Sequence, residues 1–273
     1  MSGDANWIVE AREALLDALA ALDAHRASVI LVGAQAIYLH TGRVTFGIAE
    51  ATKDSDLVFD PRSLSPDPLL EEALSRAGFV PDPSSDQPGA WLSSRGIPVD
   101  LMVPESLAGP KGRRAAHIPP HGQRIARRTV GLEAALVDHQ PRVIESLSGN
   151  GRSAVANVAG PAALLVAKLH KLGDRQNDTS RLNDKDAHDI YRLLVVTATA
   201  ELAEGFRRLL ADELARDTTL AAIGSLAELF ASGATALGSA MAGRAEFRVG
   251  QPDVVAAAVS VLAQDLLSEL AGP

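Results

Sequence analysis

The chain has 273 residues, 47% of them hydrophobic, which is enough for one large domain or two small ones. Its formal net charge of −8 excludes a surface that binds nucleic acid throughout, so any such contact has to be a local basic patch. The absence of cysteine excludes disulfides and thiolate chemistry.

The N-terminus is acidic and lacks the layout of a signal peptide, and no run of 18 apolar residues indicates a membrane span. We therefore expect a soluble protein of the cytoplasm without a membrane partner. Residues 4–24 place Ala11, Leu15 and Leu19 at the spacing of an amphipathic helix, which we expect to pack on a sheet.

The stretch 29–60 predicts a strand, a glycine turn, a short helix, a loop and a second strand. The first strand covers Val29–Val32, and Gly33, Ala34 and Gln35 open the helix. The unpaired N–H groups and the positive end of the helix dipole can bind a triphosphate there. The alternative is that Gly33 only permits a tight turn between strand and helix.

Three acids are the main candidates for chemistry. Asp54 and Asp56 stand two residues apart on the second predicted strand, so their side chains point the same way. Asp100 stands alone in the apolar strand 97–103, which follows a hairpin turn at 94–96. If the two strands are neighbours, the three carboxylates converge and can hold one or two Mg²⁺ ions for phosphoryl transfer. The alternative for Asp100 is an acid at a strand edge that faces water.

Two sets of basic residues accompany these acids. Arg43 and Lys53 flank the loop into the second strand, where they either contact the triphosphate or are solvated. A longer basic segment follows the third acid, and its glycines and prolines predict a loop. This segment can bind an RNA backbone or nucleotide phosphates, or be a solvated charge run. Its candidate RNA-binding residues are Lys111, Arg113, Arg114, Arg124, Arg127 and Arg128.

A helix beginning at Pro161 carries Lys168 inside its apolar stripe and Lys171 at the edge of that stripe. A lysine that faces inward needs an anionic partner, which a substrate triphosphate or a carboxylate of the site can supply. The next helix contains Asp186 and Asp189 one turn apart. Either can pair with Lys168, and the intervening His188 is predicted to be solvated.

The predicted fold class is α+β. Residues 1–158 form a mixed sheet flanked by helices, and residues 159–273 form an all-α lobe that contributes the lysine and aspartate motifs to the site. The segment 198–273 is rich in alanine and leucine and ends in a helix over 252–271.

In this order, the motifs Val32-Gly33-Ala34, Asp54-Ser55-Asp56-Leu57 and Val99-Asp100-Leu101 resemble the nucleotidyltransferase fold of the polymerase-beta superfamily. Together with Lys168 and the stretch KDAHD at 185–189, they resemble AbiEii and MenT-type nucleotidyltransferase toxins over residues 25–195. Relatives usually carry a second glycine or a serine at the position of Ala34, so the phosphate grip here rests more on the backbone.

This resemblance implies Mg²⁺-dependent transfer of a nucleoside monophosphate from a nucleoside triphosphate to a tRNA 3′ end, by a toxin with an antitoxin partner. A protein or small-molecule acceptor stays open, as does a catalytically silent protein that binds a nucleotide or a partner. The expected catalytic residues are Asp54, Asp56, Asp100, Lys168, Asp186 and Asp189, the first three of them as metal ligands. The expected nucleotide contacts are Gly33, Ala34, Gln35, Arg43, Lys53 and Lys171.

Overall fold

A computed structural model describes residues 2–42, 54–110, 114–247 and 249–272. The chain divides into two compact units, one of Met1–Ala36 and Ala51–Ala159, the other of Ile37–Glu50 and Gly160–Pro273. In the part that is described, the first unit contains the strands, and the second is helical from residue 161 onward. The predicted α+β class, with a mixed sheet followed by a helical region, is confirmed.

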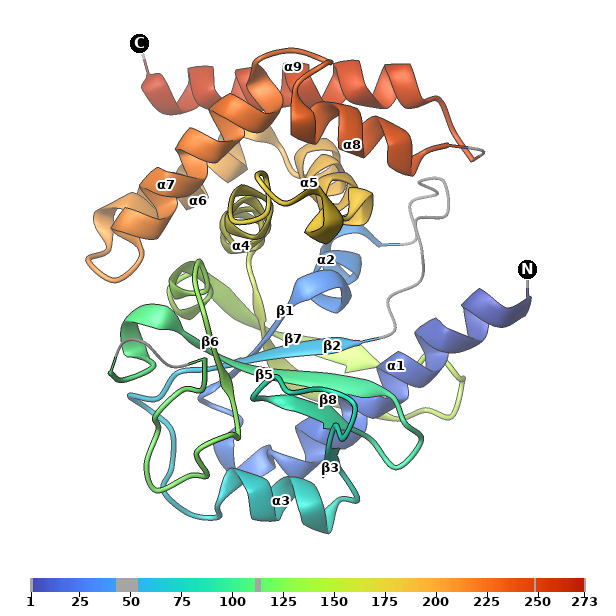
Figure 1. Cartoon of the computed structure of the whole chain (residues 1–273), viewed down its shortest axis with the longest axis vertical. Coiled ribbons are helices and arrows are strands. Elements are labelled where there is room, and N and C mark those ends of the chain that lie inside the picture. Colours follow the sequence, from blue (N-terminus) through green and yellow to red (C-terminus); the bar gives the residue numbers. More distant parts are fainter. Residues whose placement is uncertain (1, 43–53, 111–113, 248, 273) are drawn as a thin grey trace. The chain divides into compact units, whose positions relative to one another are not determined.

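The first unit is built on one mixed sheet. Its strands are β1 (Val29–Val32), β2 (Ser55–Phe59), β3 (Val80–Pro81), β4 (Ala90–Leu92), β5 (Pro98–Pro104), β6 (Arg127–Thr129), β7 (His139–Glu145) and β8 (Ser153–Ala159). The order is β3-β4-β5-β2-β1-β8-β7, with β6 paired to β5 (Figure 1). β2 runs antiparallel to β1 and parallel to β5. All four residues of β1 are buried, as expected for a central strand that is covered on both faces.

Helix α1 (Ser2–Ala21) covers one face of this sheet and contacts β2, β5, β8 and α3 (Leu70–Arg76) (Figure 1). The predicted apolar stripe of α1 is buried, since Ala11 and Leu15 have no exposed surface. Helix α2 (Gly33–Thr41) begins directly where β1 ends, as the sequence predicted.

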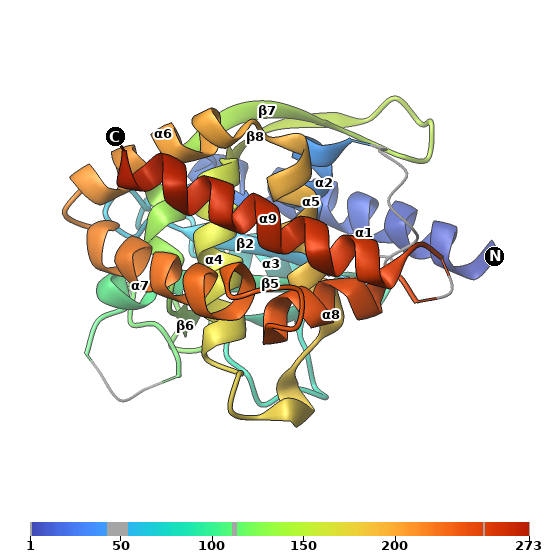
Figure 2. The same ribbon diagram turned by 90° about the horizontal axis from the view of Figure 1, so that it is seen from above.

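The second unit is a bundle of helices. They are α4 (Pro161–Gly173), α5 (Asp184–Val196), α6 (Thr199–Ala211), α7 (Arg216–Leu226), α8 (Leu237–Ala245) and α9 (Pro252–Ala271), with a π-helical segment at Ala227–Ala231. Proline occupies the first turn of α4, where its missing N–H costs no hydrogen bond. Helix α4 packs against α5, α6 and α7, and α8 packs against α5 and α9 (Figure 2).

Helix α9 is long and apolar enough to cross a membrane, with 20 residues and a mean hydropathy of 1.6. By itself, one such helix is weak evidence for a membrane span. Val259, Ala263 and Leu266 are fully buried on its inner face, and the helix contacts α6 and α8. Packing within the helical unit therefore accounts for the apolar character of this face.

The basic segment is not a loop throughout, contrary to the sequence prediction. Arg127–Thr129 form strand β6, which pairs in parallel with Met102–Pro104 of β5. The three residues of β6 are all polar or charged and show no alternation of apolar and polar residues, so the sequence did not indicate a strand here. The strand forms because it pairs with β5.

Candidate active site

Two of the three predicted carboxylates lie side by side on neighbouring parallel strands. Asp56 of β2 and Asp100 of β5 are register partners, so their side chains leave the sheet on the same face. Asp54 directly precedes β2, and all three acids are half-buried. Ser55, which stands between Asp54 and Asp56, donates a hydrogen bond of 3.3 Å to the Ala11 carbonyl of α1. The alternation along β2 therefore directs Asp56 to the face away from α1.

Helix α2 begins against one of these carboxylates. Val32, the last residue of β1, is the register partner of Asp56, and Gly33 follows it with φ +68. A Cβ atom on Gly33 would lie 2.0 Å from Oδ2 of Asp56, so only glycine permits this approach. The predicted tight turn is confirmed, whereas triphosphate binding at the start of α2 stays a prediction.

We expect Gly33→Ala to destabilise the first unit more than Gly96→Ala does. Both glycines have positive φ, which costs an alanine about 1–2 kcal/mol. Only at position 33 would the new methyl group also collide with a neighbour, the carboxylate of Asp56, because no atom lies within 4 Å of the corresponding position at Gly96. Urea denaturation of both variants measures the difference. Equal losses of unfolding free energy would show that the approach to Asp56 imposes no cost.

The side chain of Gln35 ties the first turn of α2 to β2 and α1. Its Oε1 accepts a hydrogen bond of 2.9 Å from Nε of Arg12, and its Nε2 donates one of 3.3 Å to Oγ of Ser55. Gln35 and Arg12 are buried, and burial lowers the pKa of the Arg12 guanidinium. The predicted nucleotide contact of Gln35 would therefore use its backbone N–H rather than its side chain.

Asp100 is paired with Arg127, one of the arginines predicted as candidate RNA contacts. A terminal nitrogen (Nη2) of Arg127 lies 3.0 Å from Oδ2 of Asp100. The same guanidinium donates to Oε1 of Gln87 at 2.7 Å and to Sδ of Met102 at 3.3 Å. Arg127 is the register partner of Met102, so the pairing of β6 with β5 brings its side chain to the face that carries Asp100.

The donor chemistry of the acids suits a divalent cation. Asp54, Asp56 and Asp100 offer carboxylate oxygens, which Mg²⁺ prefers, and the juxtaposition of Asp56 and Asp100 favours a cation that offsets their repulsion. Within the described ranges, however, no group of three or more His, Cys, Asp or Glu side chains is arranged to hold a metal ion. The carboxylate of Asp100 instead forms an ion pair with Arg127.

The second unit contains a buried lysine between two aspartates. Nζ of Lys168 lies 2.7 Å from Oδ1 of Asp186 and 2.7 Å from Oδ2 of Asp189. The sequence left open which aspartate pairs with Lys168, and both do. Lys171, whose side chain is 42% exposed, adds a contact of 2.9 Å to Oδ1 of Asp186. The predicted inward orientation of Lys168 is confirmed, while its catalytic role stays a prediction.

These contacts outweigh the effect of burial on the titration of both partners. Burial would raise the pKa of Asp186, but Lys168 and Lys171 lower it to about 2. Burial would lower the pKa of Lys168, but Asp189 and Asp186 raise it above its usual value. Lys168 and Asp186 are therefore both charged at neutral pH.

We expect the helical unit to lose about 2 kcal/mol of stability from Asp186 as pH falls from about 4 to 2. The pKa of Asp186 is about 2 in the folded state and 3.8 without the fold, so the unfolded state binds more protons in this range. The contribution is fully present above the unfolded value and is lost as pH falls through the folded value. Urea denaturation at pH 5 and pH 2.5 measures the effect, and Asp186→Asn should flatten the dependence. An equally steep dependence in that variant would contradict the assignment.

The predicted solvation of His188 is wrong. This side chain has no exposed surface, and its Nε2 lies 2.5 Å from Oε1 of Glu246. Its helix α5 packs against both α4 and α8. The apolar stripe in the sequence indicated only one buried face of α5, so it did not predict that His188 is covered as well. Burial lowers the pKa of His188.

The basic residues have different surroundings. Lys111 and Arg113 of the predicted RNA contacts, and Arg43 and Lys53 of the predicted nucleotide contacts, lie outside the described residues. Arg114 and Arg124 are exposed, and Arg124 donates to the carbonyl of Asp86 at 2.8 Å. The side chain of Arg128 is only 7% exposed and donates to the carbonyls of residues 108–110. The side chain of Arg128 thus bonds to the backbone of its own segment, and among the described arginines of this segment Arg114 and Arg124 are exposed.

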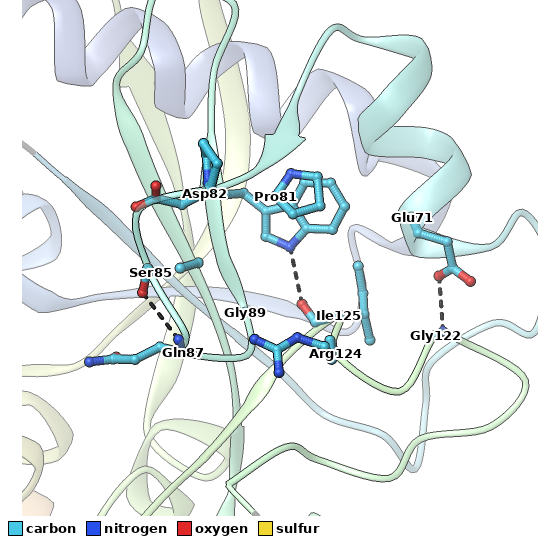
Figure 3. A pocket seen from close by; sticks show the side chains of 12 residues that line it. Glu71, Pro81, Asp82, Ser85, Gln87, Gly89, Gly122, Arg124 and Ile125 are labelled. Atoms are coloured by element: carbon cyan, nitrogen blue, oxygen red, sulfur yellow. Dashed lines mark hydrogen bonds between the residues drawn. The ribbon is translucent and has the colours of Figure 1, made fainter.

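A pocket of about 550 Å³ lies at the end of the sheet formed by β3 and β4, with Glu71 on one side and Gln87 on the other (Figure 3). Trp91 lines it and is the register partner of Val99, so its side chain leaves the sheet on the face opposite Asp100. Asp54, Asp56 and Asp100 do not line this pocket, although Gln87, which does, also bonds to the arginine that pairs with Asp100.

Comparison with known proteins adds a family. A family model described as nucleotidyltransferase matches residues 10–214, a range that includes all the predicted acids and Lys168. None of the curated proteins matches the chain. A crystal structure of a candidate nucleotidyltransferase from H. pylori is 12% identical over 95% of each chain, with a TM-score of 0.34.

Proposed function

Because the chain belongs to the nucleotidyltransferase family, we propose that it transfers a nucleoside monophosphate from a nucleoside triphosphate to an acceptor, at a centre formed by Asp54, Asp56 and Asp100. The observation that carries this proposal is the register of Asp56 and Asp100 on one face of the sheet. The start of α2 at Gly33, in contact distance of Asp56, supports it as a place for phosphates.

We assign the following roles to the residues of this chain. Asp54, Asp56 and Asp100 would hold Mg²⁺, which when bound neutralises phosphate charge and lowers the pKa of the acceptor hydroxyl. Backbone N–H groups at the start of α2 would bind the triphosphate, as at other helix N-termini. In the helical unit, Asp186 and Asp189 position Lys168, Lys171 contacts the same Asp186, and we propose a catalytic role for this network. The helical unit would thereby act as the second domain of the enzyme.

We further propose a tRNA 3′ end as the acceptor and a toxin–antitoxin system of the cytoplasm as the setting. The resemblance of Asp54-Ser55-Asp56, Lys168 and the stretch 185–189 to AbiEii and MenT-type toxins supports this. So do the exposed Arg114 and Arg124, which supply local positive charge in a chain of net charge −8.

The test is incubation of the protein with each of the four α-labelled nucleoside triphosphates, Mg²⁺ and total tRNA. Label should appear at the 3′ end of tRNA. Replacing Arg114 and Arg124 by alanine should weaken labelling and reduce its salt dependence, because each removes a phosphate contact. Arg76→Ala, at an exposed arginine paired with Glu72 on α3, is the matched control. Label found only on a protein or a small molecule would overturn the tRNA assignment, and unchanged salt dependence would overturn the role of the two arginines.

A further inference from the structure

The carboxylate of Asp100 is next to a cation that the chain itself supplies. The Asp100–Arg127 pair measures 3.0 Å, and the guanidinium is also held by Gln87 and Met102. The backbone of Arg127 lies in β6, which is paired with β5. Arg127 is therefore placed beside Asp100 by the fold and does not reach it from a solvated loop.

The Gln87 contact is itself supported by a close backbone approach. A Cβ atom on Gly89 would lie 2.2 Å from the carbonyl oxygen of Leu101 and 2.8 Å from the backbone nitrogen of Arg127. Gly89 also has a positive φ of +79. Only glycine lets the segment that carries Gln87 lie this close to β5 and β6. The segment that carries Gln87 thus packs directly against the backbone of Arg127.

The ion pair can nevertheless be separated. The side chains of Arg127 and Asp100 are 28% and 24% exposed, so water can solvate both charges when they part. A divalent cation on the same carboxylate would stand within a few ångströms of the guanidinium, where two positive charges repel. A divalent cation and Arg127 would therefore compete for the carboxylate of Asp100.

We propose that Arg127 is the resident counter-ion of Asp100 and competes with a divalent cation for this carboxylate. Metal binding at the proposed active site is then weak until a phosphate of the nucleotide substrate binds the guanidinium of Arg127 in place of Asp100. Arginine is well suited to bind phosphate in this way. Arg127 is a positioning residue in this account, since it acts through Asp100. The inference rests on the proposed function because it assumes that the acids bind metal.

The test measures binding of Mn²⁺ alone to the full chain, without nucleotide, from the electron paramagnetic resonance signal of free Mn²⁺. Arg127→Gln should bind Mn²⁺ about tenfold more tightly than the parent, because one nearby positive charge is removed. In the background of Asp100→Asn, the same change should have a much smaller effect, because no carboxylate is left for the two cations to compete for and only their longer-range repulsion remains. Gln87→Leu, which loosens the arginine and keeps its charge, should tighten binding less than Arg127→Gln.

Arg62→Gln is the matched control. Arg62 pairs with Asp60 at 2.8 Å at the other end of β2, so this change also releases an aspartate, but one outside the proposed site. Its Mn²⁺ affinity should equal that of the parent. Unchanged or weaker binding by Arg127→Gln would overturn the inference. Asp56→Asn in the same experiment tests the proposed function separately. If this variant loses Mn²⁺ binding, the proposed function stands even when the inference about Arg127 fails. If Asp56→Asn binds Mn²⁺ like the parent, the metal centre of the proposed function fails as well.

Discussion

Asp56→Asn is expected to lower the rate of nucleotide transfer by on the order of 10²-fold or more, the cost of losing one preorganised electrostatic group. Asp56 is the acid that links the parts of the proposed centre, since it lies in register with Asp100 and against the first residue of α2. The amide keeps the shape of the side chain but removes the charge that a cation would need. The rate is measured as incorporation of label under single-turnover conditions.

The same variant should lose little stability, because the amide keeps the shape of the side chain and still has an oxygen that accepts hydrogen bonds. Urea denaturation of the parent and Asp56→Asn separates this loss of rate from misfolding. Asp60→Asn is the matched control, because Asp60 follows the opposite end of β2 and pairs with Arg62. Its transfer rate should equal that of the parent. Equal rates for Asp56→Asn and Asp60→Asn would remove Asp56 from the mechanism.

Lys168→Met is expected to cost the helical unit about 3–5 kcal/mol of unfolding free energy. The methionine fills a similar volume but leaves Asp186 and Asp189 without the cation that both contact at 2.7 Å. Asp189 has no exposed surface, so water cannot take over its solvation. Chemical denaturation monitored by circular dichroism gives the free energy.

Lys171→Met serves as the control for this change. Its side chain is 42% exposed and contacts Asp186 from the outside, so its loss should cost no more than about 1 kcal/mol. Adding Asp186→Asn and Asp189→Asn to Lys168→Met should recover part of the stability, because the buried charges then disappear together. A loss below about 1 kcal/mol for Lys168→Met alone would show that the network does not stabilise the fold.

The sequence predicted those features that depend on short-range pattern. The apolar run of β1, the glycine turn into α2 and the stripe of α1 were all visible in local spacing. The neighbouring position of β2 and β5 was assumed so that their acids could meet, and the register of Asp56 with Asp100 fulfils that condition. Lys168 was placed inside its helix because a lysine interrupts an otherwise apolar stripe.

The features that were missed depend on contacts distant in sequence. The pairing of Arg127 with Asp100 requires β6 to join β5, and the three residues of β6 carry no strand pattern of their own. The burial of His188 requires α8 to cover a second side of α5, about 50 residues further along the chain. The sequence pattern predicted that Arg127 lies in a basic loop and that the side chain of His188 is solvated, whereas tertiary packing places Arg127 in a strand and buries His188.

The most direct test of the central claim is a crystal structure of the protein with Mg²⁺ and a non-hydrolysable nucleoside triphosphate. We expect the metal on the carboxylates of Asp54 and Asp56, the triphosphate at the backbone N–H groups that begin α2, and Arg127 withdrawn from Asp100. A triphosphate bound elsewhere, with Asp54 and Asp56 making no contact to metal or phosphate, would contradict the assignment of this face of the sheet as the active site.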